Sequence, residues 1–122
     1  MIIRLLPRLA LPGLALASVM LTAAAAMSQG MRIVENGSAN GAPACVSCHG
    51  AKLEGNPALK TPALAGLPAA TILARLAHYA GPTGHNATMR AVATALEPPE
   101  RRAVATYISK LPKAVATSWK AH

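Results

Sequence analysis

Both cysteines of this 122-residue chain lie in one short run, Cys45-Val46-Ser47-Cys48-His49. Two thiols three positions apart, followed at once by a histidine, form the attachment signature of c-type haem. In that chemistry each sulfur adds to one vinyl group of the porphyrin, and the histidine is carried to the iron as its proximal ligand. The run therefore predicts a chain that folds around one covalently attached haem c. Cys45 and Cys48 are the expected thioether residues, and His49 is the expected proximal ligand.

Other chemistries of a C-x-x-C pair fit this sequence less well. A thioredoxin-like redox disulfide needs a βαβ context, and the chain has no strand-like alternation. A closed zinc site needs four ligands, usually including a second pair of Cys or His residues. The chain has no further Cys, and His78, His85 and His122 do not form such a pair. We therefore favour haem over a disulfide, a zinc site or a coincidental match.

The composition supports a non-protein group at the centre of the fold. Although 52% of the residues are hydrophobic, the chain has no Phe, two Tyr and one Trp. Aromatic side chains bury large areas and dominate the energetics of many cores. A small domain that is so poor in them has little bulky material for an ordinary core. A buried cofactor would supply it.

Residues 1–26 are predicted to be a secretory signal peptide. Arg4 and Arg8 precede an apolar run that closes with Ala24-Ala25-Ala26, which is an A-x-A-like cleavage site. We expect cleavage before Met27 and therefore a periplasmic protein. The run is also about long enough to span a bilayer. An uncleaved anchor, which would keep the domain at a membrane surface, is the alternative.

The sequence that follows, residues 27–112, predicts an all-α domain of about four short helices. Apolar residues recur at helical spacing in several segments, which are separated by Pro and Gly residues. These segments are residues 29–40, 68–80, 88–96 and 98–111. The last is the strongest, because two prolines open it and Pro112 ends it. Residues 50–67 are expected to form loops, and residues 113–122 a basic C-terminal tail.

The sixth ligand of the iron decides between functions, and Met89 is the predicted residue. A second strong ligand makes an electron carrier, whereas an open position favours gas binding or peroxide chemistry. Met89 follows a loop rich in Gly and Pro and stands near the start of a helical segment, so it can reach the haem face opposite His49. An ordinary core methionine is the alternative. The other candidates after the haem motif are His78, His85, His122 and the lysines, and His85 is also a candidate contact to a haem propionate.

Four parts of the sequence together resemble the bacterial class I cytochromes c. They are residues 45–50, the loop 62–67, Met89, and the helix that carries Tyr107 and ends at Leu111-Pro112. The resemblance extends over residues 29–112 and implies that 27–112 is a cytochrome c domain, in which an N-terminal helix crosses the last helix beside the haem. It also implies that Tyr107 packs at that crossing, that Met89 is the distal ligand, and that the carbonyl of Pro62 supports His49.

The sequence departs from this family at the start of the last helix. Such helices often open with Ser, Thr or Asp as N-cap, whereas here Glu97 precedes Pro98 and Pro99. The exact start of the helix is therefore left open.

The resemblance implies an electron-transfer protein and not an enzyme. The formal net charge is +8 at pH 7 and stays positive after loss of Arg4 and Arg8, which suggests redox partners with acidic docking surfaces. Nucleic acid is not an expected partner, since the chain has an export signal, no basic run and few aromatic residues. Two alternatives are a cytochrome subunit of a dehydrogenase or oxidase complex, and an open-site haem sensor or peroxidase.

Overall fold

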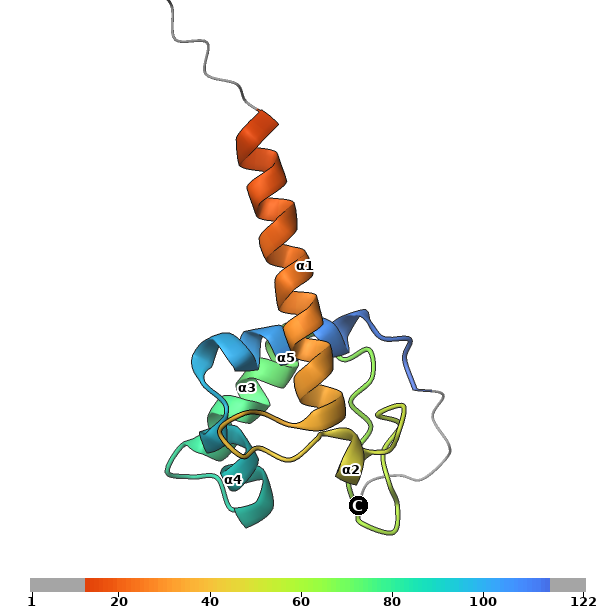
Figure 1. Cartoon of the computed structure of the whole chain (residues 1–122). Helices are drawn as coiled ribbons and strands as arrows, with labels where there is room; N and C mark the ends of the chain where they lie inside the picture. Colours follow the sequence, from red (N-terminus) through yellow and green to blue (C-terminus); the bar gives the residue numbers. More distant parts are fainter. Residues whose placement is uncertain (1–12, 115–122) are drawn as a thin grey trace, which may run out of the picture.

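The computed structural model describes residues 13–114, which form five helices joined by loops (Figure 1). The helices are α1 (Gly13–Asn36), α2 (Val46–His49), α3 (Ala69–Ala80), α4 (Ala87–Ala95) and α5 (Pro98–Lys110). The described part of the chain contains no strand, and its one β-bridge pairs Asn56 with Thr61. The prediction of a small all-α domain is confirmed.

Helix α1 differs from the prediction at both ends. The sequence pattern predicts a helix over 29–40, but α1 begins at Gly13 and ends at Asn36. The earlier start follows from a run rich in Ala, Leu and Met, which are strong helix formers. The earlier end follows from Gly37, which has a φ of +88° and donates its N–H to the carbonyl of Ile33 at 2.8 Å. A glycine in this left-handed conformation is a common helix terminator.

The C-terminal part of α1 packs on the domain, while the preceding part projects away from it (Figure 1). Residues 17–25 are exposed, and the first buried residue of the described part of α1 is Gly30. Ile33 and Val34 follow it into the core. Within residues 13–114, no helix is long and apolar enough to cross a membrane.

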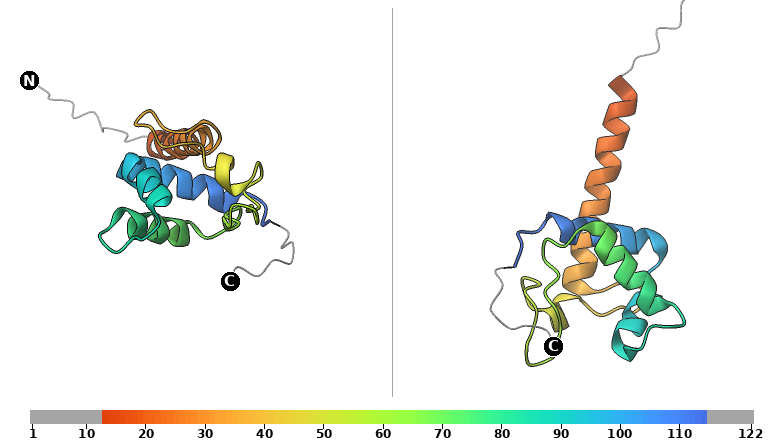
Figure 2. Two further views of the ribbon diagram at one scale, coloured as in Figure 1. Left: turned by 90° about the horizontal axis from the view of Figure 1, so that it is seen from below. Right: turned by 180° about the vertical axis from the view of Figure 1, so that it is seen from behind.

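Helix α5 lies between α1 and α3, and both neighbours pack against it (Figure 2). The contact between α1 and α5 is the most extensive one between helices. At this crossing a side chain on Gly30 would overlap the carbonyl of Ala103 and lie 2.8 Å from Cβ of Tyr107. The glycine therefore allows the two backbones to come close, and Tyr107 lies at the crossing as the resemblance implied.

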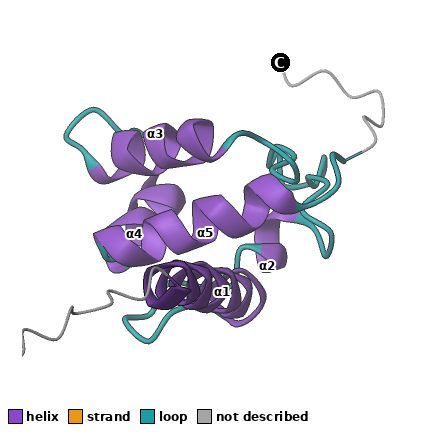
Figure 3. Ribbon diagram, turned by 90° about the horizontal axis from the view of Figure 1, so that it is seen from above, coloured by secondary structure: helices purple, strands orange, loops and turns teal. Residues whose placement is uncertain are grey.

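Helix α3 lies on the side of α5 opposite α1 (Figure 3). Helix α3 contacts both α4 and α5, and its predicted first residue, Pro68, is instead the N-cap. Helix α4 lies one residue earlier in the chain than predicted. The buried apolar residues of α3, α4 and α5 form one cluster with those of α1: Ile33, Val34, Ile72, Leu76, Val92, Ala93, Val104, Ala105 and Ile108.

The start of α5, which the sequence left open, is stabilised by its own first turn. Pro98 begins the helix and Glu97 is the N-cap. The backbone N–H of Glu97 donates to the carboxylate of Glu100 at 2.8 Å. A glutamate at the third helical position that reaches back in this way satisfies a free N–H. The helix therefore does not need the Ser, Thr or Asp that was expected.

Candidate cofactor site

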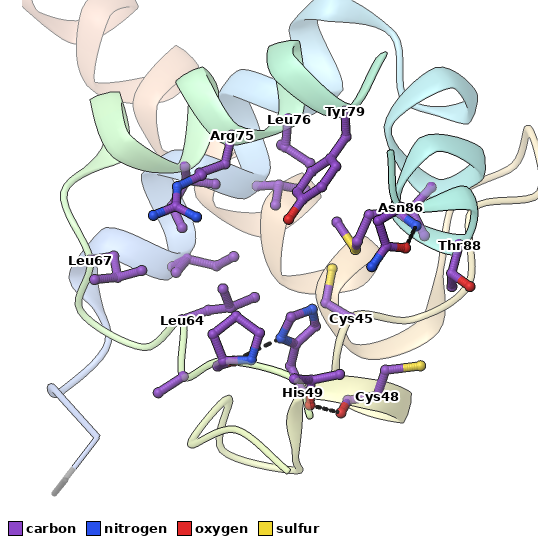
Figure 4. A pocket seen from close by; sticks show the side chains of 18 of the residues that line it. Cys45, Cys48, His49, Leu64, Leu67, Arg75, Leu76, Tyr79, Asn86 and Thr88 are labelled. Atoms are coloured by element: carbon purple, nitrogen blue, oxygen red, sulfur yellow. Dashed lines mark hydrogen bonds between the residues drawn. The ribbon is translucent and has the colours of Figure 1, made fainter. Parts of the chain in front are cut away.

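A cavity of about 630 Å³ lies between the segment 43–67 and helices α3, α4 and α5 (Figure 4). Cofactor sites in proteins commonly have volumes of about 300–1,000 Å³ and mostly apolar walls. The four residues that the sequence predicted to hold the haem all line this cavity: Cys45, Cys48, His49 and Met89. Apolar side chains from three helices form much of the rest: Ile72, Leu76, Val92, Val104 and Ile108.

The two cysteines are held by the single turn of α2. The N–H groups of Cys48 and His49 both donate to the carbonyl of Cys45, at 3.3 and 3.0 Å. This turn brings residues three positions apart onto one side of the helix, which is why both thiols face one cavity. Burial raises the pKa of the Cys45 thiol to about 11. Redox-active cysteines have a lowered pKa instead, so Cys45 does not resemble the nucleophile of a catalytic dithiol.

His49 is oriented by the backbone of the loop that follows. Its side chain is 6% exposed, and its Nδ1 lies 2.8 Å from the carbonyl oxygen of Pro62. Because a carbonyl can only accept, Nδ1 donates this hydrogen bond, and Nε2 is the ring nitrogen left to bind a metal. The ring points into the cavity (Figure 4). The carbonyl support from Pro62 that the resemblance implied is confirmed by this hydrogen bond.

The loop that presents Pro62 is bonded to α2. The hydroxyl of Thr61 donates to the carbonyl of Cys48 at 2.6 Å, and the N–H of Gly55 donates to the carbonyl of His49 at 2.7 Å. Asn56 and Thr61 close the turn between them with two backbone hydrogen bonds of 3.1 Å. The loop therefore holds the carbonyl of Pro62 in a fixed position relative to the imidazole.

Met89 lies in the first turn of α4 and is half-buried at the cavity. Its N–H donates to the side-chain oxygen of Asn86 at 2.9 Å. Of the rival histidines in the described part of the chain, His78 and His85 are exposed, and neither lines the cavity. His122 lies outside the described residues.

The charges at the cavity are basic. Lys60 and Arg75 line it and are exposed. None of the glutamates within residues 13–114 lines the cavity. Glu35 and Glu54 border a separate hollow between α1 and the end of α5, and the other two lie at the start of α5. Hydrogen bonds from its own N–H and that of Lys52 lower the pKa of the exposed Glu54 carboxyl.

The polar residues that line the cavity from α3 and the start of α4 were not predicted from the sequence. Arg75 and Tyr79 point into it from α3, and Asn86 and Thr88 reach it from the loop and first turn of α4 (Figure 4). Asn86 could have been predicted as the N-cap of this helix, because Asn is a preferred N-cap residue whose side-chain oxygen accepts the N–H of the third helical residue. The side chains of Arg75 and Tyr79 had none.

The cavity fits a haem by its volume, its apolar walls and the position of His49, whose Nδ1 is engaged by Pro62. Residues 34–112 match the family model described as cytochrome c. The chain belongs to the cytochrome c family. It is a bacterial class I c-type cytochrome, and its cofactor is covalently bound haem c, for which its two cysteines fit the attachment motif. Family and relatives support electron transfer rather than catalysis as the activity of this domain.

Two relatives of this cytochrome are named as thiosulfate dehydrogenase electron acceptors. The chain is 43% identical over 70 residues to the protein of Thiomonas intermedia (strain K12), covering 57% of this chain and 32% of the relative. It is 34% identical over 97 residues to that of Stutzerimonas stutzeri (strain A1501), covering 79% and 45%. This cytochrome therefore spans less than half the length of these curated relatives.

Solved structures share the fold. A thiosulfate dehydrogenase from Marichromatium purpuratum superposes with a TM-score of 0.70 at 30% identity, over 74% of this chain and 19% of that one. Reduced cytochrome c4 from Pseudomonas stutzeri superposes with a TM-score of 0.64 at 29% identity, over 73% and 50%. The cytochrome thus matches about half of a cytochrome c4 chain.

Proposed function

We propose that this cytochrome is a one-electron carrier whose haem iron is bound by His49 and Met89. The observation that carries the proposal is the shared cavity, which His49 lines from α2 and Met89 from α4. The haem supplies the one-electron couple. His49 and Met89 would bind its iron, and a methionine ligand would raise the reduction potential. The chain contributes the ligand pair, the hydrogen bond from His49 to Pro62 and the apolar walls that exclude water.

Replacing Met89 with alanine tests the ligand pair. We expect the variant to lose the charge-transfer band of methionine-bound ferric haem and to bind carbon monoxide when reduced. Its reduction potential should fall on the order of 0.1–0.2 V, within the range of about 0.8 V that axial ligands cover. Met31→Ala, at an exposed methionine of α1, is the matched control and should keep the wild-type spectrum. A wild-type ferric spectrum in Met89→Ala would show that another residue is the ligand.

We propose further that partners with acidic surfaces dock at the mouth of this cavity. Lys60 and Arg75 supply the positive charge there, and Leu59, which is 55% exposed, also lines the cavity. Opposite charges steer the encounter of two proteins and raise the association rate. The names of the relatives point to thiosulfate dehydrogenase as the electron donor to be tried first. A cytochrome subunit held within such a complex is the second candidate, because the same relatives are electron acceptors.

Reversing the two charges at the cavity mouth tests the docking surface. Purified thiosulfate dehydrogenase with thiosulfate should reduce the wild-type cytochrome more slowly as ionic strength rises, since salt screens exposed charges. The variant Lys60→Glu/Arg75→Glu should be reduced on the order of tenfold more slowly at low salt. Arg102→Glu/Lys110→Glu changes the net charge equally at exposed positions of α5 and should have a smaller effect. Equal effects of the two variants would contradict a localised docking site.

We propose that the chain is exported and cleaved before Met27. The proposal is supported by the exposure of residues 17–25, because loss of this part of α1 would leave its packed residues in place. The mass of the haem-loaded protein, isolated after periplasmic expression, should correspond to residues 27–122 plus one haem. A mass that includes residues 1–26 would favour the uncleaved anchor.

A further inference from the structure

Met89 is fixed from its N-terminal side by Asn86. Asn86 has an extended backbone, with φ −88° and ψ 107°, and is the N-cap of α4. Its Oδ1 accepts the N–H of Met89 at 2.9 Å. Since that N–H can only donate, the side-chain atom facing it is the oxygen (Figure 4). The hydrogen bond thus closes the turn on which Met89 stands.

Arg90, the residue after Met89, connects the first turn of α4 to the preceding loop. The Nη2 of Arg90 donates to the carbonyl of Gly84 at 2.6 Å. Gly84 is buried, and a Cβ there would lie 2.7 Å from the carbonyl oxygen of Tyr79 and 2.8 Å from that of His78. The loop therefore packs tightly on the C-terminal end of α3. Arg90 ties the first turn of α4 to that point.

These two contacts matter because α4 is short. It has nine residues, and helices shorter than about 12–15 residues are marginal on their own. Helices unwind from their ends, and Met89 is the third residue of this one. Unwinding of the first turn would carry its side chain away from the cavity. A ligand in such a position needs contacts that hold the turn closed.

We propose that Asn86 and Arg90 form a two-point clamp that positions Met89 and controls how often the distal side of the haem opens. The inference rests on the proposed function, in which Met89 is the distal ligand. Asn86 and Arg90 are positioning residues, because they act through Met89 and its turn. The clamp gives this domain a physical means of remaining a closed electron carrier rather than an open, gas-binding haem.

The rate at which the reduced cytochrome binds carbon monoxide tests the clamp, because the gas binds only after the distal ligand leaves. Asn86→Ala removes the cap, and we expect binding on the order of tenfold faster. Arg90→Ala should also accelerate binding. Asn86→Ser keeps a capping oxygen and should stay within about twofold of the wild type. Thr94→Ala is the control, since Thr94 is exposed and its hydroxyl bonds to backbone carbonyls of the same helix.

A second readout does not depend on the gas. Hydrogen exchange of the Met89 amide should be faster in Asn86→Ala than in the wild type and should be restored in Asn86→Ser. Unchanged carbon monoxide binding in both Asn86→Ala and Arg90→Ala would overturn the clamp. An Asn86→Ser variant that behaves like Asn86→Ala would also overturn the clamp. The effect of losing Asn86 would then come from its side-chain NH2 group and not from the capping oxygen.

The spectrum of Met89→Ala separates this inference from the proposed function. If Met89→Ala keeps the wild-type spectrum, the ligand assignment fails. If Met89→Ala loses the band while the clamp variants match the wild type, the clamp alone fails. Should Asn86→Ala not fold, Arg90→Ala, compared with Thr94→Ala, decides the question.

Discussion

Replacing both Cys45 and Cys48 with alanine is expected to abolish haem attachment and, with it, cooperative folding of the domain. The cavity of about 630 Å³ is large relative to a domain with so few aromatic side chains. Without haem, the apolar walls of this cavity would lose their packing partner and face water, which removes a large part of the burial that stabilises the domain. Domains of this size have a total stability of about 5–15 kcal/mol. Haem therefore serves as the centre of the core.

Expression with the haem-attachment machinery, followed by mass spectrometry and thermal melting, measures both effects. The double variant should lack the mass of a haem and show no cooperative transition in its circular dichroism. Ser47→Ala, between the two cysteines, is the matched control. The Ser47 hydroxyl bonds to the carbonyl of Ala44 and weakly to the sulfur of Cys48, so its loss should leave the haem attached and the transition cooperative. A haem-free double variant that still unfolds cooperatively would contradict this account of the core.

The parts of the site that could be predicted depend on local covalent chemistry. The spacing of Cys45, Cys48 and His49 specifies the attachment of haem whatever the rest of the chain does. The scarcity of aromatic side chains added that a cofactor fills the centre of the fold. The support of His49 by Pro62 came from the resemblance alone. No spacing rule places a carbonyl of a loop against a particular imidazole.

The parts that could not be predicted depend on how helices cross. Arg75 and Tyr79 line the cavity only because α3 packs against α4 and α5 at one particular rotation. Neither the residues that flank α3 in the sequence nor the spacing of its apolar residues determines the rotation of α3 about its axis. The capping of α5 was missed for another reason: Glu100 satisfies the N–H of Glu97 from inside the helix, so no conventional N-cap residue was needed.

Helix α1 is longer than predicted because its first part was interpreted only as a secretory signal. Residues 13–26 combine strong helix formers with the features of a secretory signal, and the signal interpretation left their helix propensity out of the prediction. The two interpretations do not conflict, because a helical segment can also be a signal. The exposed residues 17–25 fit a segment whose removal costs the core little.

Replacing Gly30 with alanine is expected to destabilise the domain by about 2–4 kcal/mol, although alanine is the better helix former by about 1 kcal/mol. The added methyl group would overlap the carbonyl oxygen of Ala103, and the carbonyl carbon lies 2.8 Å from it. Because these are backbone atoms, no change of rotamer relieves the overlap. The crossing of α1 and α5 must open, and it lies beside Val104 and Ile108, which face the haem cavity.

Thermal unfolding of the haem-loaded protein measures the effect. A domain of 60–100 residues loses about 4–8 °C in Tm for each kcal/mol, so Gly30→Ala should melt on the order of 10–25 °C below the wild type. Ser28→Ala, at an exposed position two residues before Gly30, adds no overlap with α5 and should leave the Tm close to that of the wild type. If Gly30→Ala were as stable as Ser28→Ala, the close approach of the two backbones could not be what requires a glycine at this crossing.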